Sequence, residues 1–217
     1  MTLTSPHVTS DSFFHLSPSP SPADPWPITI YLISGNPGLI SYYHTFLSLL
    51  SKKLAAGSHS SSDSTEKDAF HFHIAGHSLA GFELEPEAES EASAAKENDE
   101  EHYYDLEEQI RFVQERLEQH MHGLSSTFIS SPGHDAARSR PKVILIGHSV
   151  GSYMAMEILR RHRERRDSDN DSTFDIVGGV MLFPTVKDIA KSPSGQKLTV
   201  SAGGLASLLS FPGLFIL

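Results

Sequence analysis

The chain has 217 residues, of which 38% are hydrophobic, and it carries a formal net charge of −10. This length is enough for one substantial hydrophobic core. The negative charge argues against a nucleic-acid partner and against electrostatic attraction to an anionic membrane surface. The absence of cysteine excludes disulfides, thiol nucleophiles and cysteine-based zinc sites.

The first 26 residues are rich in serine and proline, and we expect residues 1–26 to form a disordered N-terminal segment. The prolines from Pro18 to Pro25 disfavour a regular helix or a central strand there. The segment has neither the basic region nor the apolar region of a secretory signal. No stretch of the chain is long and apolar enough to predict a transmembrane span.

Four apolar runs of strand length follow, and each predicts a buried strand. They are residues 27–34, 70–75, 142–147 and 175–183. Between them, two segments repeat apolar residues every three or four positions, which predicts helices. The apolar residues of these two helices are Tyr43, Phe46, Leu47, Leu50 and Leu54 in the first, and Leu106, Ile110, Val113, Leu117 and Met121 in the second. Strands that alternate with helices predict an α/β fold with a mainly parallel sheet.

Polar insertions interrupt this pattern near residues 57–68 and 83–101. The second insertion is strongly acidic and set among alanine, serine and proline, so we expect it to be solvated and disordered. In contrast to these polar insertions, the C-terminal residues 201–217 are apolar and carry no charged side chain. This end is expected either to begin a cap over the core or to contact lipid.

The motif Gly-His-Ser-Val-Gly at residues 147–151 indicates a serine nucleophile at Ser149. A nucleophile elbow requires a strand before the serine and a helix after it, and both are predicted here. Gly147 and Gly151 are the elbow glycines, because the tight turn leaves no room for a Cβ atom at these positions. A second Gly-His-Ser sequence contains Ser78, but no helix follows it, so Ser78 is expected on a loop.

Acyl transfer also requires two hydrogen-bond donors for the oxyanion. One is expected to be the backbone N–H of Val150, the residue after the nucleophile. The other is expected from the loop SGNPG after the first long strand. Pro37 has no N–H, so Asn36 is the first choice and Gly38 the second.

Five stretches together resemble a known family. They are ISGNPGLISYYHTFLSLL, HIAGHSLAGF, DLEEQIRFVQERLEQ, LIGHSVGSYMAMEILRR and LFPTVKDIAKSPSGQKLT. In this order they are similar to the lipid droplet-associated hydrolases, which are serine hydrolases of the α/β-hydrolase fold. The resemblance runs from about residue 28 to 200, so residues 27–200 are expected to be a partial α/β-hydrolase domain, incomplete at its C-terminal side.

The resemblance implies Ser149 as the nucleophile and the loop Gly35–Gly38 as an oxyanion element. It implies residence on the monolayer surface of lipid droplets, with a cytoplasmic or endoplasmic-reticulum pool. The implied substrates are neutral lipid esters, with sterol esters as the usual proposal. No metal or organic cofactor is expected.

The base and the acid of a catalytic triad are not evident. In this fold they follow the serine in the order acid, then histidine. Only His162 follows Ser149, and on the predicted helix it would lie roughly 20 Å away, which excludes direct base catalysis and favours a solvated surface position. His148 should point away from the nucleophile, and His44 and His77 are irregular alternatives. Asp175 and Asp188 have no following histidine to orient.

We therefore expect the triad acid and base beyond Leu217, in a chain that is C-terminally truncated and close to inactive alone. Two functions remain open. The first is a serine esterase or lipase acting on neutral lipid esters at droplets. The second is a non-catalytic droplet-surface protein that retains the fold. Acyl transfer to an alcohol other than water is a remoter possibility.

Overall fold

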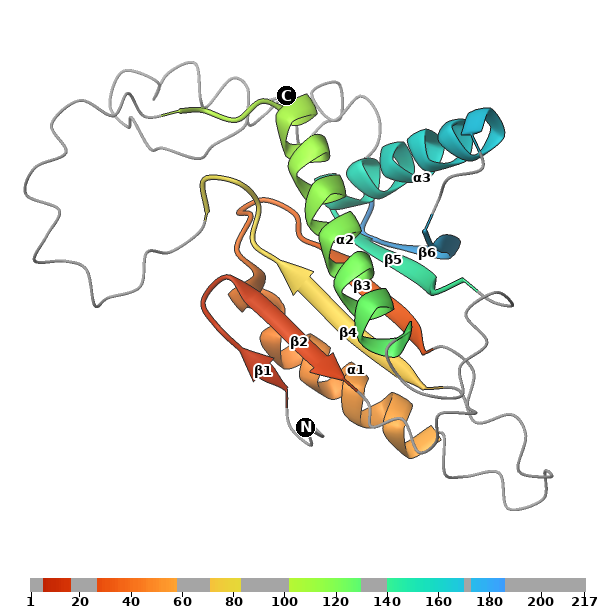
Figure 1. The fold of residues 1–217 in the computed structure, drawn as a ribbon. Coiled ribbons are helices and arrows are strands. Elements are labelled where there is room, and N and C mark those ends of the chain that lie inside the picture. Colours follow the sequence, from red (N-terminus) through yellow and green to blue (C-terminus); the bar gives the residue numbers. More distant parts are fainter. Residues whose placement is uncertain are drawn as a thin grey trace, which may run out of the picture.

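A computed structural model describes residues 6–16, 27–57, 71–82, 102–129, 140–169 and 173–185. These residues form one mixed β-sheet with helices on both faces (Figure 1). The α/β class predicted from the alternating pattern is confirmed. Three predicted segments lie outside the described residues: the polar segments 58–68 and 83–101 and the apolar end 201–217. Gly57, the first residue of the predicted insertion 57–68, is the last residue of a helix.

The sheet has six strands within the described residues, in the order β1-β2-β4-β3-β5-β6. The strands are β1 (His7–Val8), β2 (Ser12–Leu16), β3 (Ile28–Ile33), β4 (Phe72–His77), β5 (Lys142–His148) and β6 (Asp175–Leu182). Strands β4, β3, β5 and β6 run parallel, whereas β2 is antiparallel to β1 and β4. The carboxyl ends of the four parallel strands therefore meet at one edge of the sheet.

The N-terminal segment is not disordered throughout, so the expectation for residues 1–26 was wrong in part. Residues 12–16 form β2, which pairs with a strand on each side, and the Phe13 side chain is fully buried. The prolines that argued against a strand begin at Pro18, after β2 has ended. Proline restricts only its own position and the residue before it, so it did not exclude this strand.

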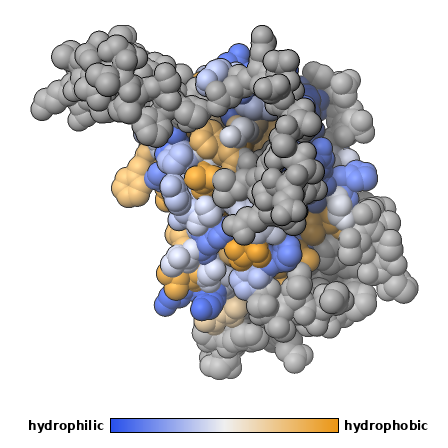
Figure 2. All heavy atoms as spheres, turned by 90° about the vertical axis from the view of Figure 1, so that its left-hand side faces the viewer, coloured by the Kyte–Doolittle hydropathy of each residue, from blue (hydrophilic) through white to orange (hydrophobic). Residues whose placement is uncertain are grey.

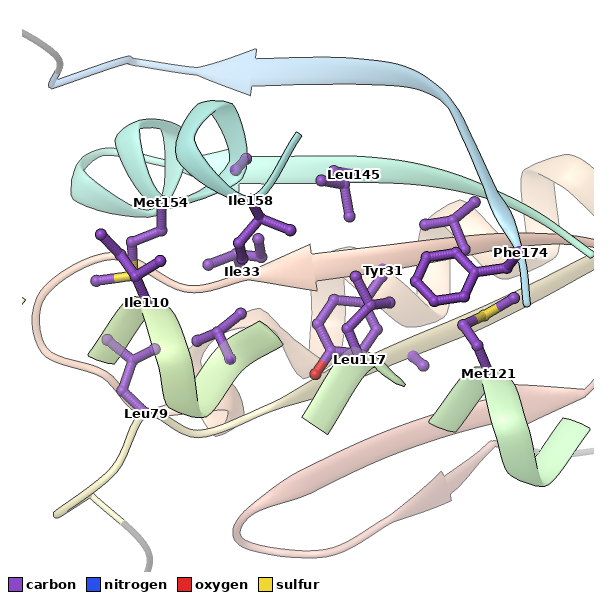
Figure 3. Packing of buried hydrophobic residues seen from close by; sticks show 14 residues of the cluster. Tyr31, Ile33, Leu79, Ile110, Leu117, Met121, Leu145, Met154, Ile158 and Phe174 are labelled. Carbon is purple, nitrogen blue, oxygen red and sulfur yellow. The ribbon is translucent and has the colours of Figure 1, made fainter. Parts of the chain in front are cut away.

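Strand residues alternate between the two faces of the sheet. Tyr31 and Ile33 of β3 pack on one face together with helices α2 (Leu106–Ile129) and α3 (Val150–Asp169). Figure 3 shows this packing, with side chains of both helices meeting those of the strands. Ile30 and Leu32 pack on the opposite face, where Leu47 of α1 (His44–Gly57) covers them. The apolar runs are thus buried on both faces because helices cover both.

Helix α2 begins at Leu106 because a capping box fixes its first turn. The Glu108 backbone N–H donates to Asp105 Oδ1, and the Asp105 N–H donates to Glu108 Oε2, each at 2.8 Å. These two bonds satisfy N–H groups that a helix start leaves without partners. Along α2, Ile110, Leu117 and Met121 are buried, as the periodicity predicted.

Helix α1 follows a short 3₁₀ turn, η1 (Ile40–Tyr43). Its apolar face is only partly buried, because Leu47 is fully covered whereas Phe46 remains 39% exposed. On the face seen in Figure 2, hydrophobic and hydrophilic side chains of the described residues lie side by side.

Strand β6 is more exposed than its apolar sequence predicts. Val177, Val180 and Met181 each expose about half of their surface, at 51%, 45% and 50%. Within the described residues β6 pairs only with β5. An apolar run predicts that a strand forms, but it does not determine which elements cover that strand.

Candidate active site

Ser149 lies at the sharp turn between β5 and α3, at the carboxyl edge of the sheet. Its φ angle is +53°, in the left-handed region that residues other than glycine seldom adopt. Three backbone hydrogen bonds hold this conformation. The Ser149 N–H donates to the Leu182 carbonyl at 3.0 Å, and the Ser149 carbonyl accepts from the N–H groups of Ser152 at 3.0 Å and Thr185 at 3.1 Å.

The glycines on either side of the turn are required by close backbone contacts. A Cβ atom on Gly147 would lie 2.5 Å from the Gly151 carbonyl oxygen. A Cβ atom on Gly151 would lie 2.5 Å from the Ser34 carbonyl oxygen at the end of β3. Backbone atoms cannot move aside as a flexible side chain can, so both positions exclude larger residues.

The loop between β3 and η1 packs directly against this turn. A Cβ atom on Gly35 would lie 2.7 Å from the His148 carbonyl oxygen and 2.8 Å from Ser149 Cβ. The Gly35 N–H donates to the Tyr43 hydroxyl oxygen at 3.1 Å and so already has an acceptor. The same loop also carries the backbone N–H groups of Asn36 and Gly38, the two expected oxyanion donors.

A largely apolar pocket, partly open to solvent, lies beside these groups. Asn36, Gly38 and Val150 line it together with the apolar side chains of Leu79, Phe82, Leu106 and Met154. Figure 3 shows Leu79, from the segment after β4, and Met154, from α3, on either side of Ile110 of α2. The expected oxyanion donors therefore share one pocket with apolar side chains.

The polar side chain of Gln109 also lines the pocket, but its amide is already bonded. Its Nε2 donates to the Ala80 carbonyl at 2.8 Å, and its Oε1 accepts from the Ala80 N–H at 3.1 Å. Gln109 is 2% exposed. It therefore fixes the loop after β4 and does not present polar atoms to a ligand.

No histidine among the described residues hydrogen-bonds to Ser149 Oγ. Its partner there is Thr185 Oγ1, at 3.2 Å. His148 Nδ1 lies 2.8 Å from the Tyr43 hydroxyl, and His77 Nδ1 lies 3.0 Å from the Tyr31 hydroxyl. Burial lowers the pKa of His77 to about 4.

The other two histidines considered from the sequence are packed against aromatic rings. The His44 ring centroid lies 6.0 Å from that of Phe13, and burial lowers the pKa of His44. His162 was expected at the surface, and this was wrong. It is 5% exposed and stacks on Phe174 with ring centroids 5.0 Å apart, because the α3 face that carries it packs onto the start of β6.

The remaining candidates have structural partners. Ser78 is 2% exposed, and its hydroxyl accepts from the Ile40 N–H at 3.2 Å, so it joins the loop after β4 to η1. Asp175 begins β6, at the edge of the sheet opposite to Ser149, and pairs with Arg166 at 2.9 Å. Asp188 lies outside the described residues.

The structure brings two residues to the site that sequence reasoning missed. The sequence predicted Tyr43 only as part of the apolar face of a helix. In the structure it ends η1, and its hydroxyl contacts Gly35 and His148. Thr185 contacts Ser149 through both its backbone and its side chain. The available signal for Thr185 was its position, two residues after the apolar run that forms β6.

The described ranges contain no group of three or more histidine or acidic side chains placed to bind a metal ion. Within the same ranges, every helix is too short or too polar to cross a bilayer.

A mainly parallel sheet in which one strand turns into a helix at a left-handed serine is typical of the α/β-hydrolase class of fold. The family model described as "Lipid-droplet associated hydrolase" matches residues 27–216. The chain therefore belongs to the lipid droplet-associated hydrolase family.

Curated relatives with this name are similar in sequence to most of the chain. The rat protein is 30% identical over 173 residues, which cover 78% of this chain and 41% of the relative. The Drosophila protein is 28% identical over 182 residues, which cover 84% of this chain and 46% of the relative. The chain thus spans less than half the length of these relatives.

Among solved structures, the chain is similar to esterase B from Lactobacillus rhamnosis, inhibited by a C4-C4 SN3 tributyrin phosphonate. The TM-score is 0.46 at 15% sequence identity, over 91% of this chain and 52% of the esterase chain.

Proposed function

We propose that this chain supplies the nucleophile and the oxyanion donors of a serine hydrolase that cleaves neutral lipid esters at lipid droplets. The observation that carries the proposal is the left-handed backbone of Ser149 beside the loop that contains Asn36. Family membership supports hydrolysis. The relatives are named lipid droplet-associated hydrolases, which supports residence on droplets.

In this mechanism Ser149 Oγ attacks the ester carbonyl carbon. The carbonyl oxygen becomes an oxyanion, which accepts hydrogen bonds from the Val150 N–H and from the Asn36 N–H, with Gly38 as the second choice. Donors that are fixed before the reaction stabilise this charge without reorganising. The pocket beside these amides then receives the acyl chain, because most of its lining is apolar and suits a lipid tail.

Serine requires a base to accept its proton and an acid to orient that base. We expect both outside the described residues. In the mechanism the base takes the proton from Ser149 Oγ and returns it to the departing alcohol. In this structure Ser149 Oγ bonds the Thr185 hydroxyl. In the mechanism the base takes the place of Thr185 as the hydrogen-bond partner of Ser149 Oγ.

A fluorophosphonate probe tests the proposal directly, because it forms a covalent bond only with an activated serine. In a form of the protein that includes the base and the acid, we expect labelling that is lost in Ser149→Ala and retained in Ser78→Ala. Ser78 is the matched control because it lies in the chain's other Gly-His-Ser sequence but bonds Ile40. Labelling that persists in Ser149→Ala would contradict the assignment.

A second candidate function is a non-catalytic protein of the droplet surface that keeps the fold. The observation that favours it is the absence of a histidine on Ser149 Oγ among the described residues. The two functions differ in their response to the probe. A chain that reaches droplets in cells but shows no Ser149-dependent labelling or ester hydrolysis would support the second.

A further inference from the structure

The Tyr43 hydroxyl joins the two segments that form the candidate site. It accepts a hydrogen bond from the Gly35 N–H at 3.1 Å, and it lies 2.8 Å from His148 Nδ1. Gly35 immediately precedes Asn36, and His148 immediately precedes Ser149. One side chain from η1 thus bridges the neighbour of an expected oxyanion donor and the neighbour of the expected nucleophile.

The two hydrogen bonds of the Tyr43 hydroxyl differ in kind. A backbone N–H can only donate, so the Tyr43 oxygen accepts from Gly35. Burial raises the pKa of Tyr43, so its hydroxyl keeps its proton at neutral pH. Between the Tyr43 hydroxyl and His148 Nδ1 either atom can be the donor, depending on the tautomer of the His148 ring.

We propose that Tyr43 is a positioning residue that holds the Asn36 N–H in the oxyanion site by tying the loop 34–38 to His148. This inference rests on the proposed function. Tyr43 does not touch the reacting atoms; it acts through the backbone of Gly35.

The tie acts on the end of the loop that faces Ser149. The other end is held separately, because the Leu79 N–H donates to the Gly38 carbonyl at 2.7 Å. Gly35 lies at the Ser149 end, where a Cβ atom would lie 2.7 Å from the His148 carbonyl oxygen, and its N–H is bonded to Tyr43. Without the hydroxyl, the Gly35 N–H and His148 Nδ1 would both lose their partner, and the loop could withdraw from the turn. A shift of about 1 Å in a donor is enough to weaken oxyanion stabilisation strongly.

The chain offers a matched control for this role. Tyr42 is the adjacent residue in η1 and is 69% exposed. Replacing either tyrosine by phenylalanine removes one hydroxyl and keeps the ring. Only Tyr43→Phe removes the bridge.

The first measurement is amide hydrogen exchange in the full 217-residue chain, which does not depend on turnover. In Tyr43→Phe we expect the Gly35 amide to exchange at least about tenfold faster, because it has lost its acceptor. Amides in the centres of β3 and β5 should be unchanged, and Tyr42→Phe should match the native chain. An unchanged Gly35 exchange rate in Tyr43→Phe would overturn the inference.

The second measurement compares hydrolysis of an ester with that of the matching thionoester, in which sulfur replaces the carbonyl oxygen. Sulfur accepts hydrogen bonds weakly, so the thionoester gains little from oxyanion donors. In a form of the protein that includes the base and the acid, Tyr43→Phe should lower kcat for the ester about tenfold, change KM less than about twofold, and leave the thionoester rate nearly unchanged. An equal loss for both substrates would show a merely structural role and reject positioning.

The proposed function is tested separately by Ser149→Ala. If hydrolysis is the same in Ser149→Ala as in the native chain, the proposed function fails, whatever Tyr43 does. If hydrolysis depends on Ser149 but the ester to thionoester ratio is unchanged in Tyr43→Phe, only the inference about Tyr43 fails.

Discussion

Ser149 and Thr185 are joined twice, although 36 positions separate them in the sequence. The Thr185 N–H donates to the Ser149 carbonyl at 3.1 Å, and the two side-chain oxygens lie 3.2 Å apart. The backbone bond helps to hold the left-handed turn, whereas the side-chain bond gives Ser149 Oγ a partner. These two contributions can be separated by mutation.

Thr185→Val removes the hydroxyl and keeps the N–H and the branched shape of the side chain. We expect a loss of about 1 kcal/mol or less in the free energy of unfolding, since a single hydroxyl pair contributes about 0.5–1.5 kcal/mol. Ser149-dependent probe labelling should be retained, because the turn keeps its backbone bonds. Urea denaturation and labelling of the same sample check both points, and loss of labelling in a folded variant would contradict this role.

Gly151→Ala should destabilise the protein by about 1–3 kcal/mol, the usual cost of forcing an atom into a packed region. The added Cβ would lie 2.5 Å from the Ser34 carbonyl oxygen. The matched control is Gly123→Ala in α2, where a Cβ atom would meet nothing within 4 Å. There we expect a gain of about 0.5–1 kcal/mol, because alanine favours a helix over glycine. Equal midpoints of urea unfolding for the two variants would refute this prediction.

Stability should fall as the pH falls from about 6.5 to about 4. Burial is the main cause that lowers the pKa of His77 and of His120 to about 4, from the usual value of 6.5 for histidine. Between these values the unfolded chain binds protons that the folded chain does not, so each histidine lowers the free energy of unfolding by up to about 1.4 kcal/mol per pH unit. Urea unfolding as a function of pH measures the slope.

His120→Phe tests this origin of the pH dependence. Among the described residues His120 Nε2 has no hydrogen-bond partner, and the ring stacks on Phe14, so phenylalanine can take its place. We expect a smaller slope between pH 6.5 and 4 than in the native chain. The control is His122→Asn, at an exposed position two residues further along α2. It should keep the native slope.

Deletion of residues 202–217 should reduce the fraction of tagged protein on lipid droplets. These residues contain five leucines, two phenylalanines and one isoleucine and no charged side chain, which favours contact with an apolar surface. Fluorescence imaging of droplets measures the effect. Targeting that survives the deletion would mean that another part of the protein contacts the droplet.

Sequence reasoning predicted what depends on local pattern. The apolar runs of β3 and β5 identified buried strands, and the glycines around Ser149 predicted the strand–turn–helix geometry now observed. The assignment of Ser149 as nucleophile stays a prediction. Strand β2 was missed because its five residues stand close to a proline-rich run and have little periodicity of their own.

What could not be predicted depends on contacts between distant residues. The hydroxyl of Tyr43 meets His148 across 105 positions, and nothing in the apolar periodicity of α1 distinguishes a tyrosine that packs from one that also bonds. The burial of His162 depends on Phe174, and the exposure of β6 depends on which elements lie beside it. These are tertiary properties, and a single sequence contains no pattern for them.

Because Gln109 bonds Ala80 with both ends of its amide, the part of the pocket lined by Leu79, Phe82, Leu106 and Met154 offers an acyl chain apolar contacts. Apolar pockets distinguish chains that differ by one methylene only by about 1–3 kcal/mol, and they reject an added hydroxyl weakly. If the pocket receives acyl chains as proposed, the hydrolase should accept a broad range of fatty acids. Its selectivity would then have to come from the alcohol side of the ester.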